Sequence, residues 1–177
     1  MLKTFSFGDS FIKWVNILNK NARLAVNQGG NLSEFFSIGR GCRQGDPISA
    51  YIFLLCAEIL AIKIRSNINI KGIQIDGIEY KLSQYADDLS TLLDGSPKSL
   101  NETLNELYAF AQYSGLKVNY DKTHVIWIGS KKYSQDSIKT KWKLSWGVQK
   151  FKLLGLNFDV DLSKLITSNY TEKNATN

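Results

Sequence analysis

One segment constrains the fold more than any other: the run from Ile48 to Ile64 is apolar on almost every side, interrupted only by Ser49, Glu58 and Lys63. It follows Asp46-Pro47, a pair typical of a helix start, because aspartate caps free N–H groups and proline suits the first helical turn. The run is slightly short for a membrane span and carries two charges. It therefore predicts a helix buried in the core of a folded domain.

Two other segments also have helical patterns. Residues 9–20 carry apolar side chains at helical spacing, so we expect an amphipathic helix there. Farther along, Ser96-Pro97 combines a capping residue with a first-turn proline, and leucines then recur on one face until Gly115, a residue suited to a helix end. The sequence therefore predicts a clear third helix between these two signals.

Between the second and third predicted helices the pattern becomes strand-like. Ile73–Ile75 and Ile78–Tyr80 flank Asp76-Gly77, a strong hairpin signal because both residues tolerate a positive φ. A second hairpin is expected from Leu82 to Leu93, with Ala86-Asp87-Asp88 at its tip. Further short strands are expected at Arg23–Asn27, Phe35–Ile38, His124–Ile128 and Phe151–Phe158. This mixed order of elements predicts an α+β fold.

The composition is that of a folded domain without disulfides. Hydrophobic residues make up 44% of the 177 residues and charged residues 21%, which is ample apolar material for one core. The two cysteines, Cys42 and Cys56, form neither a disulfide framework nor a metal-binding spacing. The first residues contain no long apolar run typical of a signal peptide. We therefore expect an intracellular protein, nuclear or cytoplasmic, with no transmembrane segment.

Positive charge lies on both sides of an acidic centre. The chain has a net charge of +6, whereas residues 46–129 have a net charge of −3 and residues 130–152 alone carry +6. Basic segments around an acidic centre suit a polyanion held close to a metal-binding core. Solvated surface lysines account for the same distribution, so charge alone does not identify a nucleic-acid site.

Two adjacent carboxylates, Asp87 and Asp88, are the strongest candidates for chemistry. Neighbouring residues on a regular strand point to opposite faces, so their side chains converge on one ion only at a turn. The predicted hairpin supplies that turn. Carboxylates placed in this way can hold Mg²⁺ ions that position phosphates and neutralise charge during phosphoryl transfer. The alternative is an Asp-Asp pair at a solvated turn that binds no ligand.

Four motifs occur together with this pair in a recognisable order. Tyr85-Ala86-Asp87-Asp88 resembles the YxDD box of reverse transcriptases, and Arg43–Ser49 resembles their RQGxPLS motif. Downstream, Gly115–Asn119 and Lys122-Thr123 resemble the GLxxNxxKT motif, and Leu154-Gly155 is similar to the LG of the primer-grip hairpin. As a set, the motifs resemble most closely the reverse transcriptases of retrotransposons that lack long terminal repeats, the LINE type.

The resemblance implies a fold and an activity. It implies a polymerase palm over residues 1–158, in which helices pack on one face of an antiparallel sheet, followed by a polar tail over residues 159–177 that we expect to be disordered. The implied activity is RNA-directed DNA polymerisation by two-metal nucleotidyl transfer. The implied cofactor is Mg²⁺, two ions in the family, with Mn²⁺ as a substitute. The implied partners are an RNA template, a DNA primer and deoxynucleoside triphosphates.

The resemblance also implies roles for individual residues. The metal-binding catalytic carboxylates would be Asp87 and Asp88, and Lys122 would protonate the departing pyrophosphate as a general acid. By the same comparison, the residues beside the incoming nucleotide and template would be Arg43, Gln44, Gly45 and Tyr85, and the primer grip would include Leu154 and Gly155. Without the resemblance, Lys122 reads as an ordinary surface lysine.

One part of the family's metal site has no counterpart in this sequence. Polymerases of this type use a third carboxylate on a strand that precedes the RQG box, and the only acidic residues before Arg43 are Asp9 and Glu34. Asp9 is expected to cap the first helix, and Glu34 matches no family ligand. We therefore expect an N-terminally truncated domain, inactive or nearly so by itself, whose intact protein has an upstream segment with the fingers and the missing strand.

Two other functions are compatible with the same residues. The chain could be a non-catalytic nucleic-acid-binding remnant of a decayed element, because nothing in one sequence dates a truncation. An RNA-dependent RNA polymerase is less favoured, because those enzymes usually carry Gly-Asp-Asp where this chain has Ala86-Asp87-Asp88.

Overall fold

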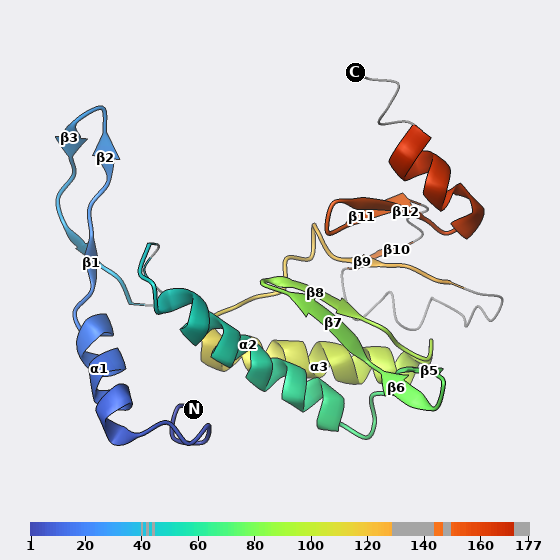
Figure 1. Cartoon of the computed structure of the whole chain (residues 1–177), viewed down its shortest axis with the longest axis horizontal. Helices are drawn as coiled ribbons and strands as arrows, with labels where there is room; N and C mark the ends of the chain where they lie inside the picture. Colours follow the sequence, from blue (N-terminus) through green and yellow to red (C-terminus); the bar gives the residue numbers. More distant parts are fainter. Residues whose placement is uncertain (40, 42, 44, 129–143, 147–149, 172–177) are drawn as a thin grey trace.

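A computed structural model describes residues 1–39, 41, 43, 45–128, 144–146 and 150–171. Figure 1 shows α1 and the first four strands at one end, and α2 and α3 side by side beneath a series of hairpins at the other. The helices are α1 (Asp9–Asn19), α2 (Ser49–Ser66) and α3 (Pro97–Ser114). The strands are β1 (Arg23–Leu24), β2 (Asn27–Gln28), β3 (Asn31–Leu32), β4 (Phe36–Ser37), β5 (Ile73–Ile75), β6 (Ile78–Tyr80), β7 (Leu82–Tyr85), β8 (Asp88–Thr91), β9 (His124–Val125), β10 (Ser145–Trp146), β11 (Lys150–Leu153) and β12 (Leu156–Asp159).

The first 38 residues form a helix and a long, narrow hairpin. The predicted helix at residues 9–20 is confirmed as α1, although Gly8 and not Asp9 occupies its N-cap position. The first predicted strand is divided into β1 and β2, the second is shortened to β4, and β3 lies between the two predictions, because β1 pairs with β4 and β2 pairs with β3. Apolar side chains of this part remain at the surface; Trp14 is 62% exposed and Phe35 is 65% exposed.

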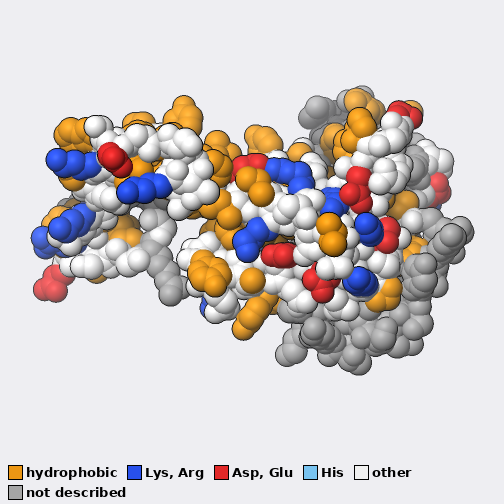
Figure 2. Space-filling model, turned by 90° about the horizontal axis from the view of Figure 1, so that it is seen from below, with side chains coloured by type: hydrophobic (Ala, Val, Ile, Leu, Met, Phe, Trp, Pro, Cys, Tyr) orange, Lys and Arg blue, Asp and Glu red, His pale blue; other side chains and the backbone are white. Residues whose placement is uncertain are grey.

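The second helix confirms the main prediction and corrects two details. It begins at Ser49, two residues later than the Asp46-Pro47 signal predicts, and Asp46 instead accepts a hydrogen bond from the Ile48 amide in the turn before the helix. The helix is also not buried on all sides. A stripe consisting of Tyr51, Leu54 and Ile62 is exposed, because only the opposite face of α2 packs against other described elements. Figure 2 shows hydrophobic side chains at the surface of this face and of the N-terminal part.

The core lies between α2, α3 and one face of the β7–β8 hairpin. Its buried centre consists of Leu60, Ile64, Ile70 and Phe110, and Leu82 and Leu89 of the hairpin pack against it, as do Ile59, Leu93 and Leu107. No helix in the described part of the chain is long and apolar enough to cross a membrane. One face of the apolar helix α2 is therefore part of the core, and the other face is at the surface.

Helix α3 follows its sequence signals closely. Ser96 occupies the N-cap position and its side chain accepts a hydrogen bond from the Ser99 amide, with Pro97 in the first turn. The helix ends at Gly115, whose φ of 76° is left-handed. Both predicted termini are thus confirmed.

The strands form two-stranded ladders in the described part of the chain, and all but one are antiparallel. The two predicted hairpins are confirmed as β5–β6 and β7–β8. The exception is the pair of β9 and β10, which is parallel. The combination of helices with small antiparallel sheets confirms the α+β class, whereas the described strands do not join into the single sheet expected of a palm.

The C-terminal region differs from its prediction. Residues 151–158 are not one strand but the hairpin β11–β12, which turns at Leu154 and Gly155 with φ values of 48° and 85°. After β12 come a 3-10 helix (Leu162–Lys164) and a π-helix (Thr167–Thr171), where the sequence suggested a disordered tail. The reason is a contact between separate segments, since the side chain of Asn169 pairs with both backbone groups of Asn157 at the outer edge of β12. Residues 172–177 lie outside the described part.

Candidate active site

The two candidate metal ligands lie at the tip of the β7–β8 hairpin. Tyr85 and Asp88 are the last paired residues, so the chain reverses through Ala86 and Asp87 alone. Asp87 and Asp88 are both exposed. The turn that sequence reasoning requires for converging neighbouring carboxylates is therefore present.

The backbone of this turn is in an unusual conformation. Ala86 has a φ of 50°, a value that residues with a Cβ rarely adopt and that costs about 1–3 kcal/mol unless the surroundings support it. Part of that support comes from Gln84, whose side-chain amide donates a hydrogen bond of 3.2 Å to the Ala86 carbonyl. Strained backbone of this kind is concentrated at functional sites.

The hairpin has one face toward the core and one face free. The register pairs Leu82 with Thr91 and Gln84 with Leu89, and the leucines of this set pack against the core. Residues on the opposite face are Ser83, Tyr85, Asp88 and Ser90, since side chains alternate along a strand. Tyr85 is 67% exposed, so its ring lies beside Asp88 on the free face and is not a core residue.

The acids present fit part of a magnesium site. Asp87 and Asp88 offer hard oxygen ligands with open surroundings, which suits Mg²⁺, an ion that keeps water and substrate phosphates in its other positions. No group of three or more metal-binding side chains exists among the described residues. The described chain therefore offers two candidate carboxylate ligands, both from one hairpin.

The RQG segment is only partly described, because Gln44 lies outside the described residues. Arg43 is half-buried, and its guanidinium contacts the Asp46 carboxylate at 2.7 Å. Gly45, between them, has a φ of 81°, so a glycine suits this turn. The resemblance implies that Arg43 lies beside the nucleotide and template, and it gives no sign that Asp46 already engages the guanidinium.

Lys122 lies in the connection between α3 and β9. Its backbone amide hydrogen-bonds to the carbonyl and side-chain oxygen of Asn119, and the Thr123 hydroxyl donates to the same carbonyl at 2.7 Å. This turn is ordered by Asn119, and the Lys122 side chain is exposed. In the described part of the chain, no ion pair joins Lys122 to Asp87 or Asp88.

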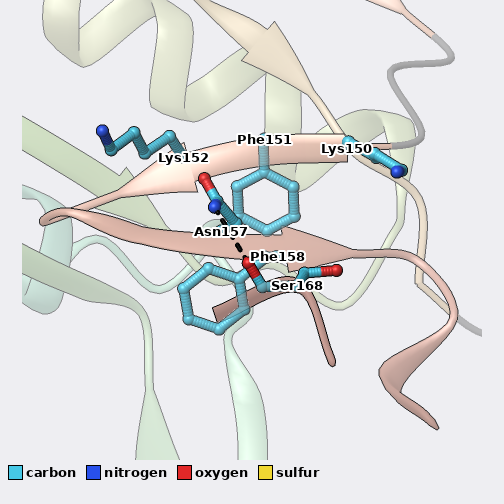
Figure 3. A pocket seen from close by; sticks show the side chains of 6 residues that line it. All are labelled: Lys150, Phe151, Lys152, Asn157, Phe158 and Ser168. Carbon is cyan, nitrogen blue, oxygen red and sulfur yellow. Dashed lines mark hydrogen bonds between the residues drawn. The ribbon is translucent and has the colours of Figure 1, made fainter. Parts of the chain in front are cut away.

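Leu154 and Gly155 form the tip of the β11–β12 hairpin rather than the middle of a strand. Behind this tip, Phe151 and Phe158 are cross-strand partners with stacked rings whose centroids are 5.2 Å apart. Figure 3 shows Lys150 and Lys152 on either side of this ring pair, with Asn157 hydrogen-bonded to the Ser168 carbonyl. The residues of the expected primer grip thus belong to an exposed, basic hairpin.

The base of the β7–β8 hairpin contains residues that sequence reasoning missed. Lys81 is 8% exposed, and its ammonium donates hydrogen bonds to the carbonyls of Arg65 and Asn67 at the end of α2. The Glu79 carboxylate lies 3.5 Å away. Glu79 and Lys81 are two residues apart in an extended segment, and that spacing, which puts opposite charges on one face, was the available signal.

Two carboxylates near this base have lowered pKa values. A hydrogen bond from the Gly72 amide, which outweighs partial burial, and the nearby Lys81 ammonium hold the pKa of Glu79 below its ordinary value. Burial raises the pKa of Asp94, but hydrogen bonds from the amide and hydroxyl of Ser96 outweigh it, so that pKa is also lowered. Both acids are therefore ionised at neutral pH and serve as fixed acceptors.

Comparisons with known proteins agree with the motifs. A family described as reverse transcriptase (RNA-dependent DNA polymerase) matches residues 2–158. The chain is 27% identical over 157 residues to the transposon TX1 uncharacterized 149 kDa protein of Xenopus laevis. It is 28% identical over 127 residues to the retrovirus-related Pol polyprotein from type-2 retrotransposable element R2DM of Drosophila melanogaster.

The two alignments cover 88% and 72% of this chain but only 12% of each relative. The chain thus spans about an eighth of the length of these curated proteins. The matched family, by contrast, accounts for nearly the whole described chain and includes every motif at the candidate site. The chain therefore belongs to the reverse transcriptase family.

Proposed function

We propose that this chain is the palm portion, residues 1–158, of an RNA-directed DNA polymerase encoded by a retrotransposon without long terminal repeats. The observation that carries the proposal is the pair Asp87-Asp88 at a two-residue turn, in a chain whose family match spans the hairpin. The polymerase would work inside the cell, in the nucleus or cytoplasm. Its template would be RNA, its primer DNA and its substrates deoxynucleoside triphosphates.

In this proposal, Asp87 and Asp88 would hold Mg²⁺, or Mn²⁺ in its place. When bound, the ions would activate the attacking hydroxyl and stabilise charge on the leaving oxygens. The exposed position of both carboxylates leaves room for triphosphate and water among the other ligands. An upstream segment would contribute the third carboxylate, since two acids from one tip cannot surround two ions.

The remaining candidate residues would bind and orient the substrates. Gly45 and Gln44 would lie beside nucleotide and template, where a residue without a side chain permits close approach. Arg43 would reach a phosphate only by exchanging its bond to Asp46, so its contribution depends on that exchange. Tyr85, on the free face next to Asp88, would contact the nucleotide and template.

Lys122 and the basic β11–β12 hairpin would act on the phosphates of the substrates. Lys122 would protonate the leaving pyrophosphate, which requires its exposed side chain to turn toward the hairpin tip once substrate is bound. The β11–β12 hairpin, with Leu154 and Gly155 at its tip, would hold the primer strand.

Primer extension on poly(rA)/oligo(dT) tests the proposed function. The unextended chain should show no extension, and a fusion of an upstream segment from a related reverse transcriptase, supplying fingers and aspartate strand, should restore it. Asp87→Asn in the fusion should abolish extension, whereas Asp121→Asn should leave it unchanged. A folded fusion that binds primer and template but never extends would contradict the proposal.

A further inference from the structure

The buried ammonium of Lys81 makes an unusually complete set of contacts for a lysine. Its Nζ atom lies 2.9 Å from the Arg65 carbonyl, 3.0 Å from the Asn67 carbonyl and 3.5 Å from a carboxylate oxygen of Glu79. Two of the three N–H donors of the ammonium thus have carbonyl acceptors, and the Glu79 carboxylate pairs with its charge. Lysine is almost never this buried unless it is paired, and the two hydrogen bonds are directional.

The two carbonyls belong to the end of α2. Arg65 is in its last turn and Asn67 is its C-cap residue. The last carbonyls of a helix have no partner within the helix and carry the negative end of its dipole, so a cation placed there satisfies and stabilises them. Lys81 therefore caps α2 from outside the helix.

The same residue closes the base of the candidate catalytic hairpin. The Lys81 carbonyl accepts a hydrogen bond of 2.8 Å from the Leu92 amide, just beyond the ladder of β7 and β8. Only β7 and one turn residue separate Lys81 from Asp87. Figure 1 shows this hairpin beginning near the end of α2 and extending back over the two helices.

Apolar packing holds the hairpin on the helices but does not fix its direction. Leu82 and Leu89 contact the core, and such contacts tolerate sliding and tilting because the hydrophobic effect is not directional. The two hydrogen bonds of the Lys81 ammonium are directional. They fix one end of the hairpin to one end of α2, and so determine where its other end lies.

We propose that Lys81 is a positioning residue for the metal-binding tip: by joining the base of β7–β8 to the end of α2, it fixes Asp87 and Asp88 relative to the helices. The inference rests on the proposed function of the two aspartates. It assigns to Lys81 no contact with metal or substrate.

The test compares Lys81→Met and Lys81→Arg with the control Lys98→Met, which removes an exposed lysine of α3. Methionine keeps most of the buried volume and removes the ammonium, whereas arginine keeps the charge and the donors. Hydrogen exchange measures the anchor directly. In Lys81→Met, the Leu92 amide should exchange about ten times faster than in Lys98→Met after correction for global stability measured on α3 amides. Lys81→Arg should recover part of that protection.

Mn²⁺ titration followed by amide NMR then measures positioning. Mn²⁺ bound at the tip should broaden a defined set of amide signals, which Asp87→Asn should abolish. In Lys81→Met that set should change or spread, because the tip no longer holds one place over the helices. Lys98→Met should leave it unchanged.

The outcomes separate this inference from the proposed function. If the Leu92 amide exchanges at the same rate in Lys81→Met as in Lys98→Met, Lys81 does not anchor the hairpin, whether or not the chain binds metal. Faster exchange combined with an unchanged Mn²⁺ pattern overturns the positioning role. If Asp87→Asn does not alter Mn²⁺ broadening in the parent chain, the metal site itself is wrong, and the positioning role of Lys81 is overturned with it.

Discussion

Tyr85 and Asp88 face each other across the last rung of the β7–β8 hairpin, on the side turned away from the core. Between them lie only Ala86 and Asp87, so the ring of an exposed tyrosine and two exposed carboxylates occupy one small tip. Tyr85, which is expected beside the nucleotide, therefore lies next to the two aspartates that are expected to hold the metal.

Replacement of Asp87 should weaken metal binding more than replacement of Asp88. Asp87 is in the turn itself, whereas Asp88 is the first residue of β8 and is held beside Tyr85. Asp87→Asn should reduce Mn²⁺ affinity roughly tenfold or more, the scale typical of losing a group that supports a metal site. Paramagnetic relaxation of water protons measures this affinity. Equal and negligible effects of the two substitutions would identify the tip as a solvated turn.

The positive φ of Ala86 predicts opposite effects of two substitutions at one position. Glycine should be neutral or stabilising by up to about 1 kcal/mol, because relief of the backbone strain is offset by the entropy that glycine loses on folding. Valine should destabilise by about 1–2 kcal/mol, because a β-branched side chain is poorly tolerated at positive φ. Urea unfolding of both variants measures the difference. A more stable valine variant would mean that the turn has another conformation.

Elements with complete local signals could be predicted from the sequence. Ser96, Pro97 and Gly115 mark both ends of α3 by capping chemistry alone. Asp76 and Gly77 both have positive φ, as their hairpin signal requires. The α+β class and the family follow from such signals and from motif order.

Features that depend on tertiary contacts could not be predicted. Leu154 has a φ of 48°, which no propensity of leucine suggests, so the sequence pattern predicts one strand where the structure has the β11–β12 hairpin. The Asn169 side chain orders the segment after β12 through contacts twelve residues away. Within the candidate site, the ion pair between Arg43 and Asp46 could not be predicted. Comparison of motifs indicates which substrate a residue could contact, but it does not indicate which side chains of the same protein lie beside it.

Gly72 should not tolerate even one additional carbon atom. A Cβ at this position would lie 2.2 Å from the Tyr80 carbonyl oxygen, and backbone cannot move aside as a flexible side chain can. Gly72→Ala should therefore destabilise the chain by about 1–3 kcal/mol. The control is Gly39→Ala, where nothing lies within 4 Å of the added atom. Urea unfolding of both variants checks the contrast, and equal midpoints would contradict the close approach of residues 72 and 80.

Acid should destabilise the fold partly through Asp94, two residues before the N-cap of α3. The pKa of its carboxyl is lowered from 3.8 in the folded chain, because hydrogen bonds from Ser96 outweigh the effect of burial. A lowered pKa means that the folded state favours the ionised form, so the resulting stability is complete above the ordinary pKa and is lost as the pH falls through the folded value. The free energy of unfolding should thus decline in this region through Asp94.

Asp94→Asn tests this contribution because asparagine keeps an oxygen acceptor for Ser96 but does not titrate. The variant should be less stable than the parent chain at neutral pH, and its free energy of unfolding should fall less steeply as the pH drops below the ordinary carboxyl pKa of 3.8. Asp121→Asn, which removes an exposed carboxylate elsewhere, serves as the control for the change in net charge. Urea unfolding at a series of pH values provides the measurement. Parallel curves for the parent chain and Asp94→Asn would show that the bonds from Ser96 do not favour the ionised carboxylate, and acid unfolding would then begin at other carboxylates.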